Sequence, residues 1–235
     1  MKILNFEKYE QLCDEAASII AQQVKQKPDC VLGLATGSSP VGIYQKLIEK
    51  NKNGEIDFSK VKSVNLDEYV GLSENDNQSY RYFMNTNLFN HINIDKNNTN
   101  VPSGVASDMQ QECIRYDKVV ENYGGIDLQL LGIGLDGHIG FNEPDDHFPT
   151  NTHVVKLDES TIDANARFFN CIDEVPKSAI TIGIKAIMQA KKVLLVAGGN
   201  KIEILKQALE GPVTPNVPAS ILQFHPDVTV IVCED

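Results

Sequence analysis

The sequence has 235 residues, of which 42% are hydrophobic, and a formal net charge of −11 at pH 7. This length allows a sizeable core, and the apolar content excludes a disordered chain. No apolar run reaches the ~18 residues of a membrane-spanning helix and no secretion signal begins the chain, so a cytoplasmic protein is predicted. The negative charge argues against nucleic acid and anionic membranes as partners, but it is compatible with a small phosphorylated ligand that is bound locally.

Short apolar or β-branched runs alternate with helical patterns, which is typical of a parallel sheet covered by helices on both faces. The predicted strands are residues 30–35, 61–66, 128–133, 154–157, 179–184, 193–197 and 228–233. The predicted helices are residues 9–26, 41–51, 78–91, 109–122 and 201–210, with shorter ones at 185–190 and from Pro218. No repeat or long linker interrupts the pattern. We therefore predict one α/β domain over residues 1–235, with a three-layer, mostly parallel, Rossmann-like sheet.

The first predicted strand leads into Thr-Gly-Ser-Ser-Pro at residues 36–40. Glycine permits close backbone approach, and proline suits the first position of a helix. Such a turn presents free N–H groups and the positive end of the helix dipole to an anion. The Gly-Lys-Ser/Thr ending of a nucleotide-binding P-loop is missing. Thr36, Gly37, Ser38 and Ser39 are candidate phosphate-binding residues, and an ordinary serine-capped helix start is the alternative.

Two adjacent acids, Asp67 and Glu68, end the second predicted strand. In an open parallel sheet, ligands bind beyond the carboxyl ends of the strands. Asp67 is therefore expected on the same rim as the Thr36 loop. Strand alternation predicts that the two side chains point in different directions and that one of them is catalytic. A solvated turn is the alternative.

The sequence Leu-Gly-Ile-Gly-Leu-Asp-Gly-His-Ile-Gly-Phe-Asn-Glu-Pro at residues 131–144 is the most informative segment. It places Asp136, His138 and Glu143 in a glycine-spaced turn directly after a strand. A carboxylate two residues before a histidine can orient the ring, and a second carboxylate can tune its proton. These three residues are predicted to perform acid/base chemistry.

The same segment matches the dinucleotide fingerprint Gly-x-Gly-x-x-Gly, with Asp158 at a suitable distance for a ribose contact. That interpretation requires a helix to open at the third glycine. Gly140 and Pro144 disfavour a helix there, and reactive side chains occupy the place where a pyrophosphate needs bare backbone. Nicotinamide binding is therefore the weaker hypothesis.

Two cations follow later in the chain. Arg167 lies in Ala-Asn-Ala-Arg-Phe-Phe, and its guanidinium is suited to bidentate phosphate recognition. Lys201 follows Gly-Gly-Asn at a predicted helix start, where a cation opposes the helix dipole and a bound anion would compensate. A surface salt bridge and a solvated lysine are the respective alternatives.

No metal site is predicted. The five cysteines lack CxxC spacing and are expected to be reduced and mostly buried. The remaining histidines have no ligand-type spacing and are interpreted as surface or core residues: His91, His147, His153 and His225.

Taken together, these segments resemble the glucosamine-6-phosphate deaminase (isomerase-type) family. The resemblance lies in the order and spacing of TGSSP, LDEYVGL, NQSYRYFM, LGIGLDGHIGFNEP, ANARFF and GGNK, and it extends over essentially the whole chain. The sister 6-phosphogluconolactonases share the fold and a Gly-Asp-Gly-His turn but lack the Asn-Glu-Pro continuation. Many family members carry Gly-Gly-Thr where this chain has Ser38-Ser39, a departure that retains hydroxyl groups.

The resemblance implies conversion of D-glucosamine 6-phosphate and water to D-fructose 6-phosphate and ammonia, without a metal, redox cofactor or Schiff-base lysine. It implies that His138 opens the sugar ring with Asp136 and Glu143 orienting it, and that Asp67 moves the proton from C2 to C1. An imidazole with a pKa near ~6.5 can both donate and accept a proton at neutral pH. The phosphate is expected to contact the cradle residues: Thr36, Gly37, Ser38, Ser39, Arg167 and Lys201.

Two alternatives stay open: a 6-phosphogluconolactonase-type hydrolase and a non-catalytic sugar-phosphate sensor. Longer hexameric family members bind an anionic effector through basic residues after the Asn-Glu-Pro turn and a C-terminal extension. Residues 145–155 of this chain contain no Lys or Arg, and the chain ends at Asp235, just after the last predicted strand. A monomer or small non-cooperative oligomer is therefore expected.

Overall fold

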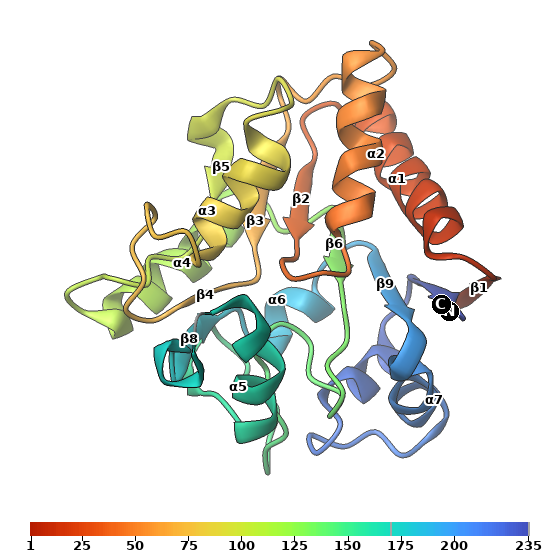
Figure 1. The fold of residues 1–235 in the computed structure, drawn as a ribbon. Coiled ribbons are helices and arrows are strands. Elements are labelled where there is room, and N and C mark those ends of the chain that lie inside the picture. Colours follow the sequence, from red (N-terminus) through yellow and green to blue (C-terminus); the bar gives the residue numbers. More distant parts are fainter. Residues whose placement is uncertain (170, 235) are drawn as a thin grey trace.

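The computed structural model of the protein describes residues 1–169 and 171–234, so Asn170 and Asp235 lie outside the described residues. Seven strands form one sheet in which every neighbouring pair is parallel, in the order β1-β10-β9-β6-β2-β3-β5. Their bounds are β1 Lys2–Phe6, β2 Val31–Leu34, β3 Lys62–Asn65, β5 Thr99–Asn100, β6 Leu128–Leu131, β9 Val193–Gly198 and β10 Val228–Cys233. Helices pack around this sheet (Figure 1). The predicted α/β fold with a mostly parallel sheet is thereby confirmed.

The helices follow the predicted pattern with local differences. Their bounds are α1 Tyr9–Gln26, α2 Val41–Lys52, α3 Tyr80–Met84, α4 Met109–Asn122, α5 Glu159–Asn165, α6 Ile184–Met188 and α7 Ile202–Glu210. In place of the predicted helix 78–91, the α-helix α3 ends at Met84 and a π-helix follows over Asn85–Phe89. The segment from Pro218 forms a 3-10 helix that ends at Phe224. No helix in the described ranges is both long and apolar enough to cross a membrane.

A second, three-stranded sheet was not predicted. Its strands β4 (Asp67–Tyr69), β8 (Ser178–Thr181) and β7 (His153–Lys156) are antiparallel, in the order β4-β8-β7. The prediction that residues 154–157 and 179–184 belong to the parallel sheet was therefore wrong. Burial alternates along β7, and a strand with one solvated face is typical of antiparallel sheets, whereas central parallel strands are buried on both faces.

The order of the parallel strands determines where the site forms. β9, β6, β2 and β3 are consecutive neighbours, and their carboxyl ends lie along one edge of the sheet. All four are largely buried, so the backbone leaving each strand begins from a fixed position. The polar segments singled out in the sequence follow these strands. They therefore meet at one place although up to 165 residues separate them in the chain, from Thr36 to Lys201 (201 − 36).

Candidate active site

A cavity of about 380 Å³ lies beyond these strand ends. All predicted site residues except Glu143 line it: Thr36, Gly37, Ser38, Ser39, Asp67, Asp136, His138, Arg167 and Lys201. Glu143 is buried beside this wall and contacts His138. The sequence therefore identified a set of residues that the fold brings together.

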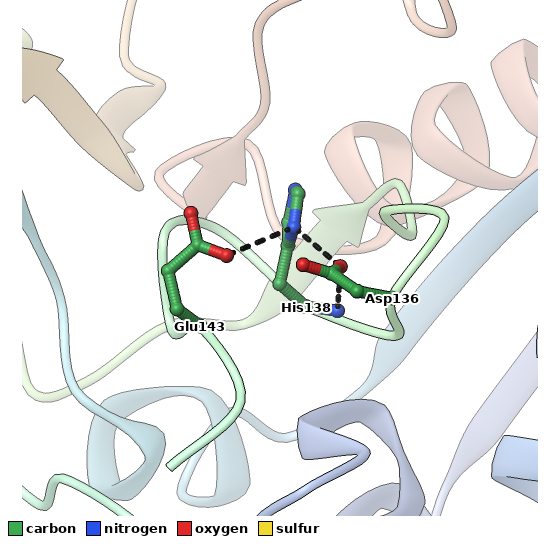
Figure 2. A group of neighbouring side chains, drawn as sticks. All are labelled: Asp136, His138 and Glu143. Carbon is green, nitrogen blue, oxygen red and sulfur yellow. Dashed lines mark hydrogen bonds and ion pairs between the residues drawn. The ribbon is translucent and has the colours of Figure 1, made fainter. Parts of the chain in front are cut away.

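Asp136, His138 and Glu143 form one cluster in the loop after β6, and Figure 2 shows both carboxylates directed at the same ring nitrogen. His138 Nδ1 lies 2.7 Å from Asp136 Oδ1 and 3.6 Å from Glu143 Oε2. Asp136 Oδ1 also accepts the backbone N–H of His138 at 3.1 Å. The other ring nitrogen points away from both acids (Figure 2). Because Nδ1 faces two acceptors, it keeps its proton in both the cationic and the neutral ring, and Nε2 is the nitrogen that can exchange a proton with the substrate.

The loop geometry depends on glycine where the ring packs against the backbone. A Cβ atom at Gly134 would lie 2.3 Å from the imidazole of His138, so any side chain there would displace the ring. Gly137 and Gly140 have φ angles of 89° and 60°, in the left-handed region that favours glycine.

The charges of this cluster are strongly shifted. Burial by itself would lower the pKa of His138, but its contacts with Asp136 and Glu143 outweigh burial and raise the pKa to about 9. Burial would also raise the pKa of Asp136, yet the contact with His138 holds it well below its usual range. The two acids thereby favour the cationic form of His138 at pH 7, whereas an isolated imidazole, with a pKa near ~6.5, is mostly neutral there.

Asp67 is 5% exposed at the start of β4 and borders the cavity. Burial, followed by the negative charge of Glu68, raises the pKa of Asp67 to about 8, and His138 opposes this shift. Glu68 points elsewhere and accepts the backbone N–H groups of Tyr69, Tyr80 and Arg81. The prediction that the two acids point in different directions is confirmed, and only Asp67 of the pair lines the cavity.

Residues 36–39 form an open loop between β2 and α2. Gly37 has φ +86° with free space where a side chain would start, so the backbone N–H groups stay accessible. Arg167 Nη2 donates to Ser38 Oγ at 3.4 Å. The pKa of Lys201 is lowered, first by burial and second by the charge of Arg167. Two neighbouring cations beside an N–H cradle repel each other and would be stabilised by an anion.

Sequence reasoning missed the residues that shape the cavity walls. Tyr9, from the start of α1, donates to Ser39 O at 2.8 Å and accepts the N–H of Gly42 at 3.1 Å, which fixes the loop from behind. Tyr80 stacks on Phe141 with ring centroids 5.9 Å apart. Only the NQSYRYFM motif pointed to Tyr80, because an aromatic side chain has no sequence spacing that marks it as part of a cavity.

Two groups of described residues have the composition of a metal site: Asp136–His138–Glu143 and the exposed group Asp145–Asp146–His147. In the first, the 2.7 Å contact between Nδ1 and Oδ1 has the length of a charge-assisted hydrogen bond. Ligand atoms ~2.1 Å from a tetrahedral zinc ion would lie farther apart. This spacing fits a shared proton better than a shared cation.

Comparison with known proteins gives a consistent result. The sequence model of the Glucosamine-6-phosphate isomerases/6-phosphogluconolactonase family matches residues 6–231. The chain belongs to this family. It is 64% identical over 234 residues to a glucosamine-6-phosphate deaminase of Lachnoclostridium phytofermentans, covering 99% of each chain. It is 55% identical over 236 residues to a namesake from Clostridium perfringens, covering 100% of this chain and 98% of the relative.

Solved structures of the family agree with the fold. A monomeric glucosamine-6-phosphate deaminase superposes with a TM-score of 0.97 and 46% identity, covering 99% of this chain and 97% of that one. A 6-phosphogluconolactonase from Thermotoga maritima has a TM-score of 0.77 at 19% identity, covering 100% and 99%, and shares the fold alone.

Proposed function

We propose that this protein converts D-glucosamine 6-phosphate and water to D-fructose 6-phosphate and ammonia, with residues 1–235 acting as one catalytic domain. The observation that carries the proposal is the buried carboxyl of Asp67 in the same cavity as the His138 cluster and a cationic N–H cradle. The names of relatives at 64% and 55% identity support the same substrate. We place the activity among hydrolases of C–N bonds and in the cytoplasm, with no cofactor required.

Binding begins at the phosphate. The N–H groups of residues 36–39 and the cations Arg167 and Lys201 hold the end of the sugar that does not react, which orients C1 and C2 toward the acids. The phosphate also screens the two cations from each other. Substrate binding therefore relieves the repulsion between Arg167 and Lys201.

Ring opening is assigned to His138. As a cation, it donates its Nε2 proton to the ring oxygen, and the resulting neutral imidazole accepts the proton of the anomeric hydroxyl. Asp136 and Glu143 stay beside Nδ1 throughout and keep the ring oriented. The products of this step are the open-chain aldehyde and a restored imidazolium.

Asp67 then acts on carbon. Its carboxylate removes the proton from C2 while the imidazolium of His138 protonates the oxygen on C1, which gives an enolamine. The carboxylic acid then returns the proton to C1, which leaves a protonated imine at C2. Water adds to this imine, ammonia leaves, the remaining proton returns to His138, and D-fructose 6-phosphate remains. A pKa of about 8 makes Asp67 a stronger base than a solvated aspartate, which suits abstraction from a weakly acidic carbon. Hydrolysis of a lactone needs no carbon base, so this residue favours deamination over the alternative activity.

Ammonia release from D-glucosamine 6-phosphate by the purified protein tests the proposal, and we expect full activity in excess EDTA without added nucleotide. 6-Phosphogluconolactone serves as the comparison substrate, and its hydrolysis should not exceed the spontaneous rate. Loss of activity on chelation, restored by a divalent ion, would disprove metal independence. Lactone turnover without ammonia release would replace the proposed reaction with the other one.

We also propose a monomer or a small oligomer with hyperbolic kinetics, since the relative with a TM-score of 0.97 is described as monomeric. Segment 145–155 offers an anionic effector no lysine or arginine.

Arg167→Ala and Lys201→Ala are each expected to raise KM by roughly 10-fold or more, because a charge-assisted contact contributes about 1.5–3 kcal/mol. The change in kcat should be smaller, since neither residue is assigned a contact with C1 or C2. Steady-state kinetics on both variants measures this effect. Lys206→Ala, an exposed lysine on α7, is the matched control. KM values equal to that of the control would mean that neither cation contacts the phosphate.

A further inference from the structure

Two residues at the end of β8, Thr181 and Ile182, connect the two halves of the site. Thr181 lies directly opposite Asp67 in the β4–β8 ladder. The N–H of Ile182 donates to the carbonyl of Leu66 at 2.8 Å. The backbone that carries Asp67 is therefore held by the end of β8.

The same two residues also hold the loop that carries His138 and Glu143. The hydroxyl of Thr181 accepts the backbone N–H of Phe141 at 3.1 Å. The carbonyl of Ile182 accepts a hydrogen bond from Nδ2 of Asn142 at 2.9 Å. Phe141 and Asn142 lie between the two catalytic side chains in sequence, so these contacts fix the loop at its centre.

The contact region is closed to water and to larger side chains. Thr181, Asn142 and Ile182 are fully buried. A Cβ atom at Gly140 would lie 3.0 Å from Thr181 Oγ1 and 3.5 Å from Asp67 Oδ2, so the bare backbone of the loop passes close to both groups. If the Thr181 hydroxyl were removed, no solvent molecule could take over the N–H of Phe141 without moving the loop.

We propose that Thr181 is a positioning residue that sets the distance between the carbon base Asp67 and the His138–Glu143 pair. The inference rests on the proposed deaminase function, because only a reaction that uses both groups on one substrate depends on their spacing. Thr181 does not belong to the phosphate cradle. Its loss should consequently affect turnover and leave binding of the substrate intact, since displacements of about an ångström can lower rates by ~100-fold.

The test compares three variants by ammonia release and thermal melting. Thr181→Val keeps the shape but removes the hydroxyl, and we expect kcat to fall at least ~10-fold with KM within about 3-fold of the parent. Thr181→Ser keeps the hydroxyl and should restore kcat to within about 3-fold. Thr152→Val is the matched control, because Thr152 is also buried but its hydroxyl donates to Asp117, and it does not line the cavity.

Normal turnover of Thr181→Val, or a serine variant as impaired as the valine variant, would overturn the inference. Equal losses in Thr181→Val and Thr152→Val would also overturn it, because they would reflect stability alone. If Thr181→Val does not fold, Thr181→Cys takes its place. We then expect the same fall in kcat with KM close to that of the parent, since a thiol has a similar size but is a weak acceptor. An inactive parent would instead count against the proposed function itself.

Discussion

Replacing Asp67 with Asn is expected to lower kcat for ammonia release by more than ~100-fold while KM changes little. The amide has the shape of the carboxyl but cannot take a proton from C2. The phosphate contacts lie elsewhere in the cavity, so binding should persist. Steady-state kinetics of the variant measures the effect, and near-normal turnover would remove Asp67 from the role of base.

The same variant has a stability signature that separates a folded, inactive enzyme from an unfolded one. The pKa of Asp67 is about 8 in the folded chain, against 3.8 for an unperturbed aspartate. Between pH 3.8 and about pH 8, the Asp67 carboxyl is therefore protonated in the folded state and ionised in the unfolded state. The free energy of unfolding of the parent therefore falls as pH rises from about 4 to about 8. The asparagine side chain of the variant does not titrate, so the variant lacks this loss. Thermal melts should show Asp67→Asn gaining stability relative to the parent from about pH 4 to about pH 8, and a pH-independent difference would contradict the shifted pKa.

His138→Gln is expected to lower kcat/KM by roughly 100-fold or more, because the ring-opening proton transfers lose their donor and acceptor. In the parent, kcat/KM should rise with pH as Asp67 ionises and decline as His138 loses its proton at a pKa of about 9. The rate constant rises and then declines because the active form of the protein needs Asp67 as a carboxylate and His138 as a cation. The decline at high pH should be absent from His138→Gln. His147→Gln, on an exposed loop, is the matched control and should retain the full profile.

The loops at the carboxyl edge of the sheet could be predicted from the sequence, because each loop is marked by a short, continuous segment. A run of buried residues followed by glycine and polar side chains marks the end of a parallel strand, as in the loops that begin at Thr36 and Gly132. Parallel strand ends share one edge, so these loops were expected to meet. The structure bears this out for the cavity that they line.

The second sheet and its contribution could not be predicted because pairing between distant antiparallel strands leaves no periodic signal. β4 has only three residues, and its partner Thr181 lies more than a hundred residues later. The pKa values of Asp67 and His138 were equally inaccessible, because they depend on burial and on neighbours that the fold supplies. The sequence around each site residue was enough to identify it, whereas the distances between the site residues and their charge states depend on the whole fold.

The pairing of the first strand with the last has a consequence for the order in which the molecule can be completed during synthesis. β1 pairs only with β10 in the described sheet, so the first strand lies beside the last (Figure 1). A ribosome-bound chain that has emerged through the loop after β6 already contains His138, yet it lacks Lys201 and the partner of its own first strand. Contacts of such long sequence separation form slowly. Nascent chains should thus acquire the capacity to bind a sugar phosphate only after β10 has been synthesised, in one late step that also completes the sheet.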